Sequence, residues 1–297
     1  MTDLRVLFLW NTAGALTPVA DWLLENGHAA RIIMNKQFDI YGQSSSSPAS
    51  KMVQSGQEYW FEVTRQLLKF NPTHIHVNSS LPSLVLARAF CPTKPIVFQY
   101  HGGRVRYRKK AHEETALADK VIVSTPDLSG FGEWFDRPVD KMFRYRGNRK
   151  PGTALMFYAT YFMKDLRNEA EEWCKERGLD LTIVERGKDE GIPYLQMPTF
   201  LSQFEFFLDF KGYGDPKAIS RLAIEAYACG CKIVSDTDPS REITDYNLPK
   251  PEIYVDLYKS LEDPPISFGR MNLAFRGLIR WASGRLTRLP AQRQELG

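Results

Sequence analysis

Cysteine is scarce in this 297-residue chain. Its four cysteines, Cys91, Cys174, Cys229 and Cys231, have neither the paired spacing of a zinc site nor the density of a disulfide framework, which favours a reducing compartment. No run of about 18 apolar residues occurs, so the sequence predicts no membrane-spanning helix. The N-terminus also lacks the basic and apolar segments of an export signal. We therefore expect a cytoplasmic protein.

No charge of one sign dominates the composition. Charged residues make up 25% and hydrophobic residues 43% of the chain, as is typical of a soluble globular protein. The length suffices for two cores of roughly 100–150 residues each. The formal net charge is +4 and the sequence pI is about 8.7. This mild excess suits phosphorylated ligands or anionic surfaces and does not by itself imply nucleic acid.

The first half lacks a complete G-x-G-x-x-G sequence, which weakens an assignment to nicotinamide or flavin binding. Residues 4–10 form an apolar run typical of a buried strand, and a turn at 11–14 ends in Gly14. A helix at 16–25 and a strand at 29–34 complete the opening of a doubly wound α/β sheet. Gly14 either allows a positive φ in a packed turn or lets the chain approach a ligand closely.

The same alternation of strands and helices continues to residue 235. Its predicted members are strands at 73–77, 95–100, 119–124, 154–159, 181–184, 206–210 and 232–235 and helices at 51–70, 83–90, 164–177 and 215–229. Residues 43–50 form a Ser-rich loop, and 135–150 have the composition of a linker. Residues 241–243 and 254–256 suggest a final helix and strand. The sequence thus predicts two Rossmann-like α/β domains.

One stretch, 220–236, carries the strongest chemical signal. We expect its helix to begin at Asp215-Pro216, behind the loop Lys211-Gly212-Tyr213-Gly214, where free N–H groups and the helix dipole attract phosphate. Glu225, two to three turns on, is an acceptor-only side chain suited to the paired hydroxyls of a ribose. Alternatively, it pairs with Arg221 four residues earlier. The sequence leaves both interpretations open.

The segment IEAYACGCKIVSD at 224–236 resembles the donor-site signature of GT-B glycosyltransferases, particularly the retaining enzymes of glycosyltransferase family 4. In that family a Glu-Ala-x-Ala-x-Gly run leads into a Val-Val strand, and a second Glu lies eight positions before the first. Lys217 occupies that position here. The resemblance implies two domains with a cleft between them, a UDP or GDP sugar as donor, no metal or other cofactor, and retention of configuration. It also gives Gly14 a place near the donor.

His101 follows the predicted strand at 95–100 directly, at an edge where α/β sheets bind ligands. A histidine there either reaches a substrate or is satisfied by nearby carbonyls. The resemblance implies the first role, because similar transferases carry a His that faces the transferred sugar. The basic run that follows is either a solvated face or a grip on an anionic acceptor through Arg104 and Arg106.

Further cations are candidates for binding the donor diphosphate. Related transferases place an Arg and a Lys after the first C-terminal strand; Ala159-Thr160 stands where the Arg is expected, and Lys164 and Arg167 follow. Lys164 is alternatively an exposed helix residue. The predicted donor-binding set comprises Gly14, Lys164, Lys211, Gly212, Lys217, Ser220, Arg221 and Glu225, with His101 and Glu225 as the predicted catalytic pair.

The segment 268–289 predicts a basic amphipathic helix, because no acid occurs between Asp263 and Glu295. It either lies in an anionic lipid interface or packs back on the N-terminal domain. The predicted domains are 1–145 for the acceptor, 146–265 for the nucleotide-sugar, and 266–297 for this helix. The linker at 135–150 is the expected hinge, and its residues 138–143 resemble the Gly-Val-Asp-x-x-x-Phe segment that joins the two halves in this family.

These observations predict a glycosyltransferase that uses a nucleotide-diphosphate-sugar donor. The acceptor is open: a glycan, a lipid-linked molecule or nucleic acid, with the chain acting as a monomer or homodimer. The alternatives on the same architecture are a DNA-base glycosyltransferase, a nucleotide-sugar epimerase and a non-catalytic binding protein, the last favoured by Lys217 in place of an acid.

Overall fold

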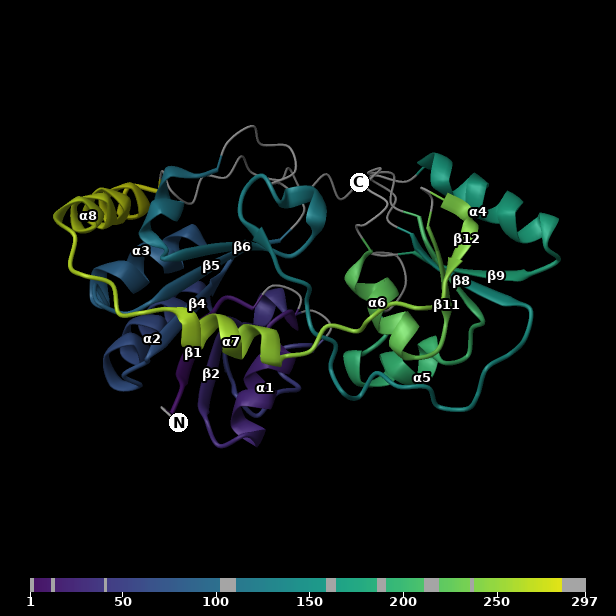
Figure 1. Cartoon of the computed structure of the whole chain (residues 1–297), viewed down its shortest axis with the longest axis horizontal. Helices are drawn as coiled ribbons and strands as arrows, with labels where there is room; N and C mark the ends of the chain where they lie inside the picture. Colours follow the sequence, from purple (N-terminus) through teal and green to yellow (C-terminus); the bar gives the residue numbers. More distant parts are fainter. Residues whose placement is uncertain are drawn as a thin grey trace.

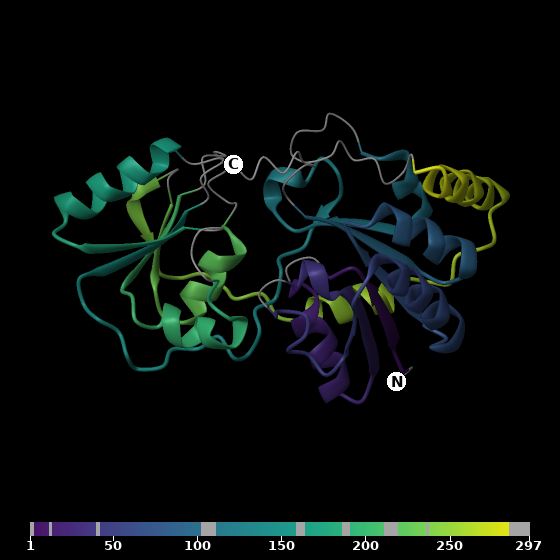
Figure 2. The same cartoon turned by 180° about the vertical axis from the view of Figure 1, so that it is seen from behind.

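The structure is a computed structural model that describes residues 3–11, 14–39, 42–101, 111–158, 164–185, 191–210, 219–235 and 238–284. Two α/β domains lie side by side and are joined by the linker that follows the first sheet (Figure 1). The view from behind shows the same two separate sheets, with the C-terminal segment returning across the N-terminal domain (Figure 2). The predicted fold class is confirmed.

The N-terminal sheet has seven strands in the order β3-β2-β1-β4-β5-β6-β7, and neighbouring strands run parallel. Its strands are β1 (Arg5–Leu9), β2 (Ala29–Asn35), β3 (Ser50–Val53), β4 (His74–Asn78), β5 (Ile96–Tyr100), β6 (Lys120–Val123) and β7 (Glu133–Trp134). Every residue of β4 and β5 is buried. Such continuous burial is what a strand covered on both faces requires.

Helices cover both faces of this sheet. On one face α1 (Thr17–Glu25) and α7 (Glu252–Ser260) share a core with alternate residues of the strands, such as Phe8 and Val97. On the other face lie α2 (Gly56–Lys69), α3 (Leu81–Phe90) and α8 (Phe268–Ala282). The N-terminal domain is therefore completed by two helices from the end of the chain.

The C-terminal sheet has five strands in the order β12-β11-β10-β8-β9, with β12 antiparallel at the edge. Its strands are β8 (Thr153–Tyr158), β9 (Asp180–Glu185), β10 (Phe206–Asp209), β11 (Lys232–Ser235) and β12 (Asp238–Ile243). Three helices accompany it: α4 (Lys164–Glu176), α5 (Met197–Leu201) and α6 (Arg221–Ala228). The second half repeats the strand and helix alternation of the first, as the sequence predicts.

Four elements differ from the prediction, two in their bounds and two in their type. The helix expected at 215–229 begins at Arg221, and a strand, β3, precedes α2 inside the range 51–70. The expected helix at 241–243 is the edge strand β12, while the expected strand at 254–256 lies within α7. Tyr254 and Tyr258 are both fully buried at helical spacing, so tertiary packing outweighs their β propensity.

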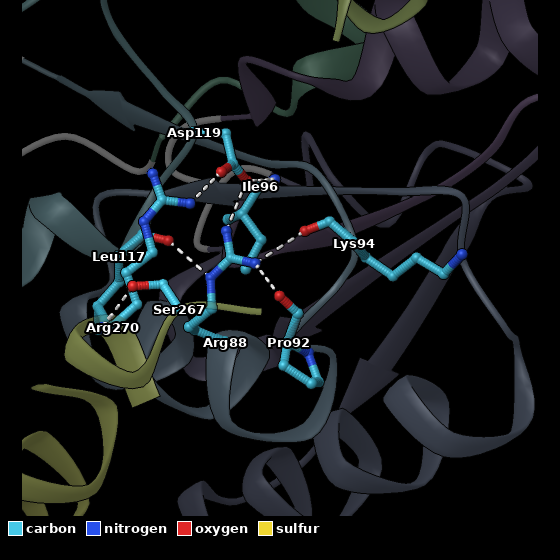
Figure 3. A network of polar contacts seen from close by, with 8 residues as sticks. All are labelled: Arg88, Pro92, Lys94, Ile96, Leu117, Asp119, Ser267 and Arg270. Atoms are coloured by element: carbon cyan, nitrogen blue, oxygen red, sulfur yellow. Dashed lines mark hydrogen bonds and ion pairs between the residues drawn. The ribbon is translucent and has the colours of Figure 1, made fainter. Parts of the chain in front are cut away.

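The helix α8 packs on α3, as one of the two interpretations of the segment expects. Gly277 makes this approach possible, since a Cβ there would meet Val85 Cγ2 at 2.7 Å. A network of hydrogen bonds and ion pairs connects the start of α8 to the N-terminal domain (Figure 3). Arg88 and Arg270 both pair with Asp119, and Arg88 also donates to the carbonyl oxygens of Leu117 (2.9 Å), Pro92 (2.8 Å) and Lys94 (3.1 Å). In the described parts of the chain, no helix combines the length and the hydropathy that crossing a bilayer requires.

Candidate functional site

His101 lies directly after β5, at the carboxyl edge of the N-terminal sheet. Its backbone N–H donates to Ser79 Oγ (3.1 Å), and its Nδ1 lies 2.8 Å from Ser124 Oγ at the end of β6. The other ring nitrogen, Nε2, is buried and has no hydrogen-bond partner within the described residues. The ring is therefore held from one side, and one nitrogen remains for a ligand.

The surroundings of His101 keep its imidazole neutral. Burial lowers the pKa of this histidine well below its usual value, and the positive charges of Arg137 and Arg221 lower it further, with a smaller contribution from His76. Arg137 comes from the linker and Arg221 from the C-terminal domain. Both positive charges therefore act on the histidine at the edge where β5 ends.

The helix α6 is positioned by two bonds at its first turn. Ser220 is its N-cap, with Oγ accepting from the N–H of Ala223 (3.2 Å). The N–H of Ser220 in turn donates to Asp209 Oδ2 (2.9 Å) at the end of β10. These bonds fix the start of α6 at the carboxyl edge of the C-terminal sheet. One of the free N–H groups expected to attract phosphate is occupied by the cap.

Glu225 pairs with Arg221 across one turn of α6. Arg221 Nε donates to Glu225 Oε1 at 2.7 Å, and Arg221 Nη2 donates to Tyr194 Oη at 3.2 Å. Glu225 is 3% exposed, so the pair is buried. Burial raises the pKa of Glu225, although Arg221 and Arg137 oppose the shift. The pairing that the sequence left as an alternative is thus present in the structure.

This pairing leaves two polar groups without a partner in the described chain. Oε1 is the carboxylate oxygen of Glu225 that Arg221 engages, and no described donor bonds to Oε2. Arg221 Nη1 is buried and also without a partner among the described residues. A ligand that offers both a hydroxyl and an anionic oxygen would satisfy both groups.

We call His101, Arg137, Arg221 and Glu225 the interdomain site. The N-terminal sheet, the linker and α6 each contribute to it. The negative charge of Asp140 in the linker also raises the pKa of Glu225. Sequence reasoning missed Arg137 because its residue type in a charged linker gives no signal. It also missed Tyr194, which orients Arg221 and carries the ring over which this guanidinium lies (5.9 Å).

Gly14 has a local structural reason. Its φ is +61°, and a Cβ there would lie 2.6 Å from Gln43 Cβ. The neighbouring Asn11 holds the turn, because it bonds the N–H of Leu16 (2.8 Å) and the hydroxyl of Thr17 (2.9 Å). A contact between Gly14 and a donor stays a prediction.

The remaining predicted site residues carry no structural evidence. Arg104, Arg106, Lys211, Gly212 and Lys217 lie outside the described residues, as does the side chain of Lys164, whose backbone begins α4. Within the described ranges, no three His, Cys, Asp or Glu side chains gather closely enough to hold a metal ion. The site therefore rests on the four residues of the interdomain site and on Ser220.

No family model matches the chain, and no curated protein matches its sequence. Solved structures similar to it include the UDP-GlcNAc 2-epimerase of Methanocaldococcus jannaschii, with 11% identity over 94% of this chain and 100% of that one and a TM-score of 0.49. The catalytic domain of starch synthase IV from Arabidopsis thaliana, bound to ADP and acarbose, has 11% identity over 96% and 98% and a TM-score of 0.48. The DNA-modifying β-glucosyltransferase has 13% identity over 96% and 100% and a TM-score of 0.47. These neighbours are glycosyltransferases and a nucleotide-sugar epimerase. The two-domain architecture stands on the strand order and packing described above, not on these similarities.

Proposed function

We propose that this protein is a glycosyltransferase that binds a nucleoside-diphosphate sugar at the interdomain site. The observation that carries the proposal is the buried pair of Arg221 with Glu225 on α6; the charges of Arg137 and Arg221 also lower the pKa of His101. Two guanidinium groups suit the charge of a diphosphate, and a carboxylate suits the hydroxyls of a ribose. The resemblance of 224–236 to a donor-site signature supports the same ligand.

In this reaction Arg221 and Arg137 stabilise the negative charge of the leaving diphosphate. As the bond from the sugar to the diphosphate breaks, negative charge develops on the leaving phosphate oxygen. Fixed cations beside that oxygen stabilise the transition state more than the ground state. The pKa of Arg221 is lowered by burial, but Glu225 and Tyr194 raise it by more, so its charge persists in the buried setting.

Glu225 is the proposed ribose ligand. Its Oε1 stays with Arg221, and Oε2 accepts a hydrogen bond from a ribose hydroxyl. The ion pair and the ligand contact are then compatible, because the carboxylate has two oxygens and several lone-pair directions. The pair also holds Arg221 in place for the diphosphate.

The test compares UDP, GDP and their 2′- and 3′-deoxyribose forms by isothermal titration calorimetry. In the natural protein, removing the hydroxyl that Glu225 binds is expected to weaken affinity roughly 10- to 100-fold, as for a hydrogen bond to a charged group. In Glu225→Gln the ribose and deoxyribose forms should bind much more alike. This comparison isolates the contact from any general effect on stability.

Tyr227→Phe serves as a control on the same helix. Its hydroxyl donates to the carbonyl oxygen of Thr244 (2.9 Å) and accepts from the N–H of Tyr246 (3.1 Å), two residues outside the four that make up the interdomain site. This variant should keep the full discrimination between ribose and deoxyribose. If the natural protein binds neither UDP nor GDP, or if Glu225→Gln keeps that discrimination, the proposed donor site is wrong. Release of nucleotide from a panel of nucleotide-sugars then distinguishes a transferase from a binding protein.

The outward face of α8 suggests where the acceptor lies. Phe268, Phe275 and Ile279 are 87%, 63% and 55% exposed, and they follow one line along the helix. Arg276 is exposed beside them. Residues 264–294 contain six arginines and no acid; of these, Arg270 and Arg280 form ion pairs with Asp119, Glu113 and Glu114, whereas Arg276 lies on the outward face. An anionic bilayer matches both the apolar line and this charge, so we propose a lipid-linked acceptor.

This part of the proposal has its own experiment. The protein should float with phosphatidylglycerol vesicles and not with phosphatidylcholine vesicles, and the triple substitution of Phe268, Phe275 and Ile279 by Ser should abolish flotation. The changed side chains are exposed, so folding should persist. Failure to float would refute the lipid acceptor. Loss of a dimer in light scattering on the same substitution would assign the face to a second copy instead.

A further inference from the structure

A chain of hydrogen bonds connects Gln99 through Ser124 to the ring of His101. Gln99, fully buried on β5, places its Nε2 3.1 Å from Ser124 Oγ and 3.1 Å from Tyr254 Oη. Ser124 Oγ lies 2.8 Å from His101 Nδ1 on its other side. Gln99 Nε2, Ser124 Oγ and His101 Nδ1 thus form one continuous path.

The path constrains where each proton lies. An amide nitrogen only donates, so Ser124 Oγ accepts from Gln99. The serine hydroxyl carries a single proton, and His101 Nδ1, 2.8 Å away, is a ring nitrogen that can accept it. A hydroxyl that donates to Nδ1 requires that nitrogen to be unprotonated. In a neutral imidazole the proton then resides on Nε2.

Two hydrogen bonds from its nitrogen hold the amide of Gln99 in this orientation. Its nitrogen faces two hydroxyl oxygens, one from β6 and one from α7, and each accepts one of its two N–H groups. The backbone N–H of Ser124 also donates to the carbonyl oxygen of Tyr100 (3.0 Å), which fixes the hydroxyl relative to the histidine. The helix α7 therefore takes part in setting the state of a residue 153 positions earlier than Tyr254.

We propose that Gln99 and Ser124 are positioning residues that hold His101 as its Nε2–H tautomer. His101 then presents a hydrogen-bond donor at the interdomain site and no basic nitrogen. If the proposed function holds, Nε2–H binds an oxygen of the donor sugar or of the leaving diphosphate. It does not remove the proton of the acceptor hydroxyl, because its only unprotonated nitrogen faces Ser124.

The tautomer is measurable in the ligand-free protein. Two-bond 1H–15N correlation spectra of protein labelled with 15N-histidine separate protonated from unprotonated ring nitrogens. The chain has five histidines, so the His101→Asn variant assigns the signal. The expected result is an unprotonated Nδ1 and a protonated Nε2. A protonated Nδ1 would overturn the proposal and would mean that the amide of Gln99 is turned by 180°.

Gln99→Glu replaces the amide, which donates to Ser124, by a carboxylate of almost the same shape, which can only accept. A carboxylate accepts the proton of Ser124, so the serine then accepts from His101 and the ring changes to the Nδ1–H tautomer. Ser124→Thr keeps the hydroxyl and should keep Nε2–H, whereas Ser124→Ala should leave a mixture of the two tautomers. If Gln99→Glu does not fold, the pair of serine variants still decides. Unchanged spectra in Ser124→Ala would contradict the proposed path.

Turnover provides the second measurement. Gln99→Glu should lower the turnover of the nucleotide-sugar roughly tenfold through kcat, as for the loss of one neutral hydrogen bond, and Ser124→Thr should retain it. The two proposals fail separately. Absence of turnover with every nucleotide-sugar refutes the proposed function, while the spectra alone decide the tautomer.

Discussion

Acidification from pH 7 to pH 5 is expected to destabilise the N-terminal domain by about 2 kcal/mol through His76 alone. This histidine, on β4, is fully buried, and its Nδ1 lies 2.7 Å from Tyr258 Oη on α7. Its ring is also close to those of Phe8 (5.8 Å) and Tyr254 (6.0 Å). Burial among these rings lowers the pKa of His76 to about 3, although Gln99 opposes the shift.

The sign and size of this loss of stability follow from proton linkage. The unfolded chain protonates His76 with a pKa near 6.5, while the folded chain keeps it neutral down to about pH 3. Between these values the unfolded state binds more protons, so stability falls as the pH falls. The linkage relation gives a difference of about 2 kcal/mol by pH 5 and about 3 kcal/mol by pH 4. His74 and His101, whose pKa values are also lowered by burial, act in the same direction.

Urea denaturation at pH 7, 6 and 5 measures this dependence as the free energy of unfolding. His76→Gln removes the titration and should reduce the loss between pH 7 and pH 5 by about 2 kcal/mol, whatever its effect on stability at pH 7. An identical slope in His76→Gln and the natural protein would refute the reasoning.

Three substitutions test the packing that supports the site. Arg88→Met should destabilise the protein by about 3–5 kcal/mol in urea, because it removes one of the two arginines that pair with the mostly buried Asp119 and leaves three carbonyl oxygens without that donor; a loss below about 1 kcal/mol would show that Arg270 alone suffices for Asp119 and would contradict this reasoning. Gly277→Ala should cost about 1–3 kcal/mol by overpacking, and the loss should shrink when Val85→Ala is added, whereas equal losses in both backgrounds would exclude the contact. Gly14→Ala should cost about 1–3 kcal/mol because its φ is +61° and the space is filled, and a neutral result in thermal unfolding would contradict the strained turn.

The fold was largely predictable because its strands are buried on both faces. Mostly apolar runs at 4–10 and 95–100 identify β1 and β5 without tertiary information. The errors occur where a short segment fits both patterns. Tyr254 and Val255 favour a strand locally, yet they form a helix because both side chains complete a core built from a distant part of the chain. No local pattern carries that information.

The site was only partly predictable for the same reason. The residue types of Glu225 and His101, at a helix and at a strand end, identified both as candidates. Their partners depend on the arrangement of three strands and two domains. Ser124 is 23 positions from His101, and Arg137 belongs to a linker without a motif. The ion pair of Arg221 with Glu225 was visible in the sequence as an i, i+4 spacing, but its burial was not.

The return of the chain to the N-terminal domain connects the fold to the proposed chemistry. Helix α7 follows the C-terminal sheet and then contributes Tyr254 to Gln99 and Tyr258 to His76. Because Gln99 bonds Ser124, which bonds His101, the ring at the interdomain site is held by residues from both ends of the sequence.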